Sequence, residues 1–288
     1  MNAFLLTIVK IVSVFSATLM IPFSALTYTL DFIPGGDRNV EANVVGAGAY
    51  FRSQGIACDG ENVYFSSKTT LIKTKSDCRT FVNMNLSAIP DELSEKYGIK
   101  HIGGISYYNG KIYAGMEDSK VWKYPVVGVF NADTLELENY CILDATEMVE
   151  GEEKLIVSRG LPWVAVDSET GYLYCTDHSK KPTRILSFDV NNDMAPVASV
   201  PLEQTIPSIQ GGEFLNGTLF VATNDDTAAI YKINVESGTS EKYLDRNLLG
   251  GEGEGMTFIY NDSKPCILSM DMGTIFINSF VREYEVTQ

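Results

Sequence analysis

The stretch that decides the fold is SQGIACDGENVYFSS at residues 53–67, where a glycine and an apolar residue open a strand, a tight turn and a second strand. The layout returns roughly every 50 residues, a period typical of repeat architectures. Repeats that each form one antiparallel sheet around a common axis make a β-propeller. The four further copies are IGGISYYNGKIYAGM (102–116), SRGLPWVAVDSETGYLYCT (158–176), IQGGEFLNGTLFVAT (209–223) and GEGMTFIYNDSKPCILSM (253–270).

Each copy is followed by further short runs rich in β-branched and aromatic residues, which gives four strands per repeat. The sequence therefore predicts an all-β, five-bladed β-propeller whose ring is closed by an N-terminal strand at 27–33. A six-bladed ring is the alternative, if 31–50 and 281–288 build a further sheet. Two insertions are expected: a helix that starts at Pro90, and an acidic surface excursion at 144–154.

The N-terminal segment differs from the rest, because about 16 uncharged, mostly apolar residues follow Lys10, fewer than the ~20 that cross a bilayer as a helix. We interpret residues 1–27 as a secretory signal peptide, with an uncleaved membrane anchor as the alternative. Residues 28–288 are then a single propeller domain. It is expected to be secreted and monomeric, and to touch a membrane only if the first segment stays attached.

Three glycosylation acceptor patterns agree with export: Asn85-Leu-Ser, Asn216-Gly-Thr and Asn261-Asp-Ser. The last two fall at predicted hairpin turns, where a glycan has room. The cysteines are odd in number and none has metal-ligand spacing. A disulfide between Cys58 and Cys78 across the first repeat is one option for them.

The net charge of −15 argues against nucleic acid as a partner, because phosphates need basic patches. It permits cationic or neutral ligands and metal ions. The chain has no GxSxG nucleophile elbow, no HExxH motif and no GxxxxGK[ST] loop. The patterns of the common hydrolases and nucleotide-binding proteins are therefore missing from this sequence.

A ligand site is expected at one mouth of the central channel. The residues before each repeat glycine and after each second strand should lie at the same face, and nearly all of them are polar or ionisable. The catalytic candidates among them are His101 and Glu254. The substrate-binding candidates are Gln54, Arg159, Asp177, His178 and Gln210.

Oxygen ligands that converge from several blades suit a hard cation, above all Ca²⁺. The expected ligands are Asn224, Asp225, Glu252, Glu254 and Asp271. His101 is either a general base, because an imidazole titrates near neutral pH, or a hydrogen-bonding spacer. Arg159 either binds an anionic group of a substrate or neutralises a neighbouring carboxylate.

Two motifs carry a family resemblance. His101-Ile-Gly-Gly-Ile with Asn109-Gly-Lys-Ile-Tyr, and Glu252-Gly-Glu-Gly-Met, resemble motifs of the secreted β-propellers that include gluconolactonase-like and strictosidine-synthase-like proteins. In the lactonase-like members an acidic residue of the E-G motif holds a metal at the channel mouth, together with Asn and Asp residues from other blades. The resemblance implies that Glu254, Asn224, Asp225 and Asp271 do so here.

Two classes of function remain open. One is metal-assisted hydrolysis of an ester or lactone, in which the metal polarises the carbonyl and Glu254 or His101 activates water. The other is a non-catalytic binding or scaffold propeller, which holds a small molecule, glycan, peptide or protein on the same face. A fold shared by many activities does not choose between them.

Overall fold

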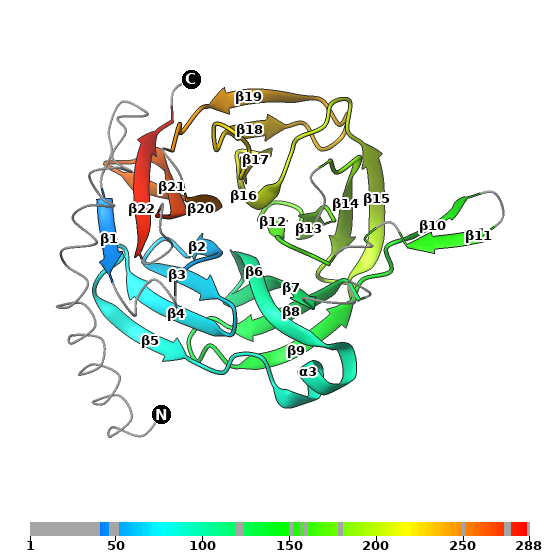
Figure 1. Ribbon diagram of the computed structural model, residues 1–288, viewed down its shortest axis with the longest axis horizontal. Coiled ribbons are helices and arrows are strands. Elements are labelled where there is room, and N and C mark those ends of the chain that lie inside the picture. The colour runs from blue at the N-terminus through cyan, green and yellow to red at the C-terminus, as the bar shows by residue number, and fades with distance from the viewer. Residues whose placement is uncertain are drawn as a thin grey trace.

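The computed structural model describes residues 41–45, 52–118, 124–149, 152–155, 157, 160–177, 181–248, 251–273 and 278–286. Five four-stranded antiparallel sheets stand around one axis, so the predicted five-bladed propeller is confirmed (Figure 1). The predicted signal peptide or anchor, residues 1–27, lies outside the described residues. No helix in the described part of the chain is long and apolar enough to cross a bilayer.

The first four blades follow one another along the chain. Blade 1 contains β2 (Ile56–Cys58), β3 (Asn62–Ser67), β4 (Thr70–Lys75) and β5 (Phe81–Asn85). Blade 2 contains β6 (Ile99–Tyr108), β7 (Lys111–Asp118), β8 (Val126–Asn131) and β9 (Leu137–Ile142). Blade 3 contains β12 (Ala165–Asp167), β13 (Tyr172–Cys175), β14 (Arg184–Asp189) and β15 (Ala195–Pro201). Blade 4 contains β16 (Ile209–Leu215), β17 (Thr218–Thr223), β18 (Ile230–Ile233) and β19 (Ser240–Leu244).

Blade 5 combines strands from both ends of the described chain. β20 (Glu252–Asn261), β21 (Lys264–Met272) and β22 (Asn278–Glu285) supply three strands, and β1 (Glu41–Val45) pairs with β22 as the fourth. The closing strand is therefore 41–45 and not the predicted 27–33, which lies outside the described residues. The six-bladed alternative is wrong, because β1 and β22 belong to this one sheet.

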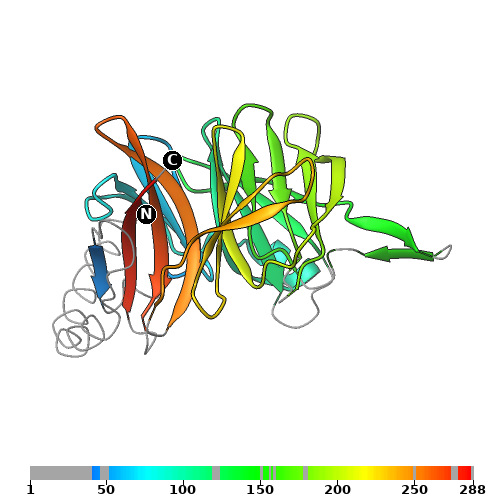
Figure 2. The same ribbon diagram turned by 90° about the horizontal axis from the view of Figure 1, so that it is seen from above.

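Both expected insertions are present. The helix α3 (Asp91–Tyr97) begins after Pro90 and ends at Gly98, whose φ of 75° gives the left-handed cap that glycine favours. The acidic excursion is a hairpin of β10 (Thr146–Val149) and β11 (Glu152–Leu155), which projects from the ring (Figure 2).

The innermost strands share one register at the axis. Ala57 pairs with Tyr64, Ser106 with Tyr113, Ala165 with Tyr174, Glu213 with Phe220 and Thr257 with Leu268. Two positions before these residues stand Gly55, Gly104, Trp163, Gly211 and Gly255. Trp163 therefore occupies the place that the sequence analysis gave to the glycine of the third repeat, Gly160. The third repeat begins three residues later than its glycine suggests.

Glycine is required at the other four positions because neighbouring backbones touch. A Cβ on Gly211 would lie 2.6 Å from Gly255 Cα, and a Cβ on Gly255 would lie 3.0 Å from Gly55 Cα. The Gly255 amide donates to the Gln54 carbonyl at 3.0 Å across blades 5 and 1. The Cα and Cβ atoms of Trp163 lie against Gly104, whereas its fully buried indole lies against Gly212 and donates from Nε1 to Thr176 Oγ1 at 3.0 Å. Closely packed backbones therefore meet around the axis at this level.

The hydrophobic core is divided into five layers, one between each pair of neighbouring blades. The layer between blades 1 and 5 packs Ile56 and Phe65 against Met270. Cys58 and Cys78 also lie in this layer as free thiols, so the pair is not joined as a disulfide in this structure. Burial raises the pKa of the Cys58 thiol to about 11 and that of Cys78 to about 12.

Candidate functional site

Glu254 is buried between blades 5 and 1. It lies in a bulge of β20, is 3% exposed, and accepts a hydrogen bond from Gln54 Nε2 at 3.4 Å. Burial raises the pKa of Glu254 well above its ordinary value, and the negative charges of Glu252 and Asp271 raise it further. In the described structure the Glu254 carboxyl serves as a hydrogen-bond acceptor for Gln54.

Asn224 and Glu252 link blades 4 and 5. Asn224 Nδ2 donates to Glu252 Oε1 at 3.1 Å, and Asn224 Oδ1 accepts from the Gly253 amide at 3.2 Å. The nitrogen and the oxygen of the Asn224 side-chain amide therefore contact the first two residues of β20, Glu252 and Gly253. Both predicted ligands are brought together here, and each is the other's partner.

Asp271 is the centre of a buried ion-pair cluster. Its carboxylate contacts Arg246 Nη1, and its second oxygen lies 3.2 Å from Arg282 Nε. All three side chains are at most 2% exposed. Arg246 also donates to the Thr223 carbonyl at 2.9 Å and to Ser269 Oγ at 2.5 Å. Two guanidinium groups thus already satisfy the charge of this predicted ligand.

Asp225 is turned away from the other predicted ligands and caps its own loop. Its Oδ1 accepts the amides of Thr227 (3.1 Å) and Ala229 (2.9 Å), and its Oδ2 accepts the Tyr231 hydroxyl at 3.0 Å. Asp59 makes the same kind of turn, since it accepts the Asn62 amide and the Tyr64 hydroxyl. The role of Asp225 is therefore local, as in turns that an Asp side chain stabilises.

The remaining predicted residues are spread over several blades. His101 Nδ1 lies 3.2 Å from Glu117 Oε2, which comes from the neighbouring strand of blade 2. Gln210 is half-buried at a bulge of β16, and its carbonyl lies beside Gly104 at the axis. Asp177 lies two residues after the end of β13 and is half-buried. Arg159 and His178 lie outside the described residues.

The residues present do not form a calcium cage. Within the described residues, no group of three or more His, Cys, Asp or Glu side chains is placed to hold a metal ion. Ca²⁺ takes six to eight oxygen ligands. Here Asp271 is engaged by arginines, Asp225 by its loop and Glu252 by Asn224.

A second acid with a raised pKa lies farther along the innermost strands. Glu213 on β16 is half-buried, and it accepts the Phe214 amide at 3.0 Å and a hydrogen bond from Thr257. Desolvation raises the pKa of Glu213 to about 8. Glu213 was not among the predicted site residues. The signal was available, since a glutamate here replaces the Ala, Ser or Thr of the other repeats.

A groove of about 1060 Å³ opens between blades 3 and 4. One side is aliphatic, with Val197 and Val200 of β15, and Tyr172 and Tyr174 of β13 add aromatic surface. Its charged lining residues in the described part are Asp167, Lys232, Glu236 and Glu241, and Lys232 Nζ lies 3.7 Å from Glu241 Oε1. The described lining therefore combines aliphatic and aromatic side chains with three acidic residues and one lysine.

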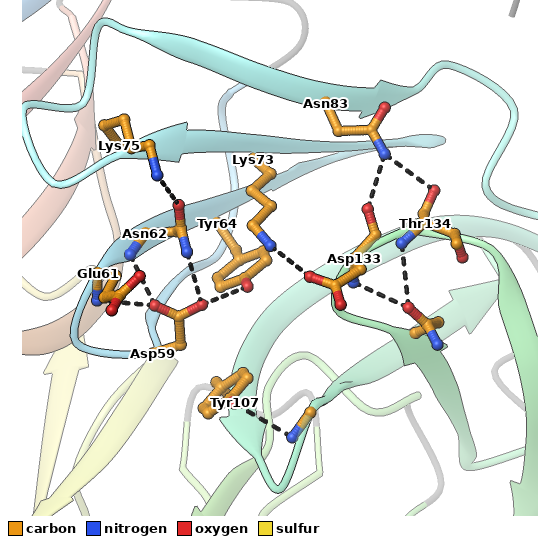
Figure 3. Close-up of polar contacts among 12 residues, drawn as sticks. Asp59, Glu61, Asn62, Tyr64, Lys73, Lys75, Asn83, Tyr107, Asp133 and Thr134 are labelled. Carbon is orange, nitrogen blue, oxygen red and sulfur yellow. Dashed lines mark hydrogen bonds and ion pairs between the residues drawn. The ribbon is translucent and has the colours of Figure 1, made fainter.

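A smaller hollow of about 510 Å³ lies between blades 1 and 2, where polar side chains join the two blades (Figure 3). Asn83 Nδ2 donates to the Asp133 carbonyl at 2.8 Å, and the buried Lys73 reaches Asp133 Oδ1 at 2.8 Å. Asn85 Nδ2 donates to the Leu135 carbonyl at 2.8 Å. These contacts tie β4 and β5 to the β8–β9 turn, so this region is a structural joint.

No protein-family model and no curated protein sequence matches the chain. Among solved structures, it resembles Kuenenia stuttgartiensis hydrazine synthase at 11% identity and a TM-score of 0.44, over 84% of this chain and 60% of that one. It resembles the Malassezia sympodialis allergen Mala s 1 at 12% identity and a TM-score of 0.49, over 78% of this chain and 72% of that one.

These likenesses, at 11% and 12% identity, assign no activity to this chain. The chain spans 60% of the length of the hydrazine synthase chain that it matches. The five four-stranded sheets of the present chain define its fold as a β-propeller.

Proposed function

We propose that the chain is a non-catalytic binding propeller, and that the groove between blades 3 and 4 holds a basic, extended peptide segment of a partner protein. The observation that carries the proposal is the groove itself. It is a hollow of about 1060 Å³ whose lining includes aliphatic side chains, two tyrosines and three acidic residues. Pockets that combine apolar surface with a few placed polar groups are the usual ligand sites of proteins.

Charge supports a basic ligand. Asp167, Glu236 and Glu241 lie at the groove, and Lys232 is the positive side chain among its described lining residues. Lys232 pairs with Glu241 within the groove, and Asp167 and Glu236 remain as its excess of negative charge. The whole chain carries a net charge of −15, which attracts a cationic partner during encounter.

Apolar contacts supply affinity in this proposal. Val197 is 43% exposed although it is a large aliphatic residue, and it lies beside Ala198 and Val200 on the groove wall. Burying aliphatic surface contributes about 25 cal/mol per Å². A peptide with apolar side chains on one face and Lys or Arg at its flanks matches both features.

The predicted mouth site is less suited to hydrolysis or binding. Its acidic and amide groups are paired with each other or with arginines, as Asn224 with Glu252 and Asp271 with Arg246. Metal-assisted hydrolysis needs a metal with an open coordination position and a base free to take a proton from water. Membership of the gluconolactonase-like proteins remains a prediction from two short motifs.

Reversal of charge at the groove tests the peptide proposal. We expect Glu236→Lys/Glu241→Lys to weaken binding of fluorescent 12-residue peptides of alternating Lys and Val or Leu by about tenfold, since several attractive contacts become repulsive. Fluorescence polarisation with the full chain measures this. Glu92→Lys/Glu95→Lys on the exposed side of α3 is the matched control, because it makes the same change of net charge elsewhere.

Three results would overturn the peptide proposal. The first is a peptide set in which no basic member binds more tightly than its acidic counterpart. The second is an equal loss of affinity in the groove variant and the α3 variant, which would mean non-specific charge attraction. The third is binding of neutral glycans in place of peptides, with loss on Tyr172→Ala, which would assign the groove to carbohydrate.

Calcium at the channel mouth is the alternative. Because the expected ligands already have partners, we expect no saturable heat in a calorimetric titration with Ca²⁺ up to several millimolar, above the ~10⁻⁴–10⁻³ M of extracellular sites. The melting temperature should be the same in EDTA and in Ca²⁺. Saturable binding that Glu254→Gln abolishes would contradict this and would restore the hydrolase hypothesis, to be followed by a lactone and ester screen.

A further inference from the structure

The three glycosylation acceptor patterns lie in different structural settings, and only one of them presents a free amide. We propose that Asn216 is the residue that carries an N-linked glycan, and that the glycan stands at the edge of the groove between blades 3 and 4. The inference rests on passage of the chain through the secretory pathway and not on what the groove binds.

Asn216 stands at the tip of the hairpin between β16 and β17. Its φ is 50° and that of Gly217 is 74°, the pair of positive values that a two-residue Asn-Gly turn requires. Both residues are exposed, and a Cβ added to Gly217 would have no heavy atom within 4 Å. The Asn216 side chain makes no hydrogen bond to any residue in the described part of the chain. Its amide nitrogen therefore faces open space.

The other two acceptor asparagines use their amide nitrogens within the fold. Asn85 Nδ2 donates to the Leu135 carbonyl at 2.8 Å, and Asn85 Oδ1 accepts from the Ser87 amide at 3.0 Å. Asn261 Nδ2 donates to Glu283 on β22. Both asparagines are half-buried. A sugar on either nitrogen would displace the partner that the folded chain holds there.

The transfer has a defined chemistry. The Asn216 Nδ2 atom bonds to the anomeric carbon of an oligosaccharide carried on a lipid diphosphate. The bond from that carbon to the diphosphate oxygen breaks, the lipid diphosphate leaves, and one amide proton is lost to a base. Thr218 supplies the hydroxyl that the acceptor pattern requires.

The hairpin tip places the glycan beside the groove. Gly217 and Thr218 both line the groove, so Asn216, which directly precedes Gly217, lies next to this lining. A glycan there is large and hydrated compared with the hairpin that carries it. Approach to the groove from the side of blade 4 is therefore narrowed in the glycosylated protein.

Mass spectrometry of the secreted protein tests the assignment. The full chain is produced in a eukaryotic secretory host, both as it stands and behind the host's own leader, so that it enters the pathway in at least one form. We expect one glycan, removed by peptide N-glycosidase in ¹⁸O water with the label on residue 216. Asn216→Asp keeps the residue type that also suits this turn and should abolish the glycan without lowering the melting temperature. Thr218→Val should give the same loss.

Asn85→Asp and Asn261→Asp are the matched controls, and each should retain the glycan. A glycan mapped to residue 85 or 261 in place of 216 overturns the assignment. So does an Asn216→Asp protein secreted with the mass of the glycosylated wild type. A wild-type chain that is secreted behind the host leader and carries no glycan overturns it as well.

Discussion

Replacement of Asp271 by alanine is expected to lower the free energy of unfolding by about 3–5 kcal/mol, the usual cost of removing one partner from a buried ion pair. Arg246 and Arg282 would then keep their charges in a region where each is at most 2% exposed. Arg246 also spans from blade 4 to blade 5 through the Thr223 and Ser269 contacts. Urea denaturation of the wild-type and variant chains, followed by tryptophan fluorescence, measures the difference.

Two controls separate the buried charge from a general sensitivity to acidic substitutions. Asp271→Asn keeps the shape and an acceptor oxygen, so it should cost less than Asp271→Ala. Glu138→Ala breaks an ion pair with Lys111 at the surface, where both side chains are more than a third exposed, and should leave the denaturation midpoint unchanged. A midpoint for Asp271→Ala equal to that of the wild type would mean that the arginines do not depend on this carboxylate.

Replacement of Trp163 by alanine is the second change with a large expected effect, about 3–5 kcal/mol. The backbone of Trp163 takes the place that glycine has in the other four blades, and its fully buried indole packs against Gly212 in the apolar layer between blades 3 and 4. Removal of the indole leaves a cavity in this closely packed layer, and little collapse can fill the space. Thermal unfolding followed by circular dichroism measures the loss.

Trp163→Phe should retain much of the packing but lose the hydrogen bond to Thr176, and should fall between wild type and Trp163→Ala. Tyr260→Ala removes another aromatic ring that is 63% exposed, and is expected to have little effect. Equal melting temperatures for Trp163→Ala and Tyr260→Ala would show that the apolar layer between blades 3 and 4 tolerates the cavity left by the indole.

Most of the fold could be predicted because its signals are local. The turn pairs Asn109-Gly110 and Asn216-Gly217 have the positive φ values that two-residue hairpins need. The start of the third repeat could not be read from glycines, because Trp163 fills the axial position there. The identity of the closing strand also escaped prediction, since it depends on the free edge of β22 and not on the composition of the N-terminal segment.

Less of the candidate site could be predicted, because side-chain partners come from distant parts of the chain. Polar residues were expected to gather at one mouth of the channel, and two of the expected pairs do make contact, Gln54 with Glu254 and Asn224 with Glu252. Nothing near Asp271 in the sequence indicates that Arg246 neutralises it. Asp225 did carry a local signal, since an Asp that opens a tight turn usually binds its own backbone. The groove is made by two blades and has no linear motif.

The ring closure has a consequence for the order of events during synthesis. Glu41 is among the first described residues, and it can pair with Arg282 only after that much later residue has been synthesised. Blades 1 to 4 have all their strands before β22 leaves the ribosome, whereas blade 5 does not. Until β21 has been made, Ile56 and Phe65 lack Leu268 and Met270, which cover them in the finished ring. A chain stalled before β21 therefore exposes apolar surface of blade 1 that chaperones and proteases recognise.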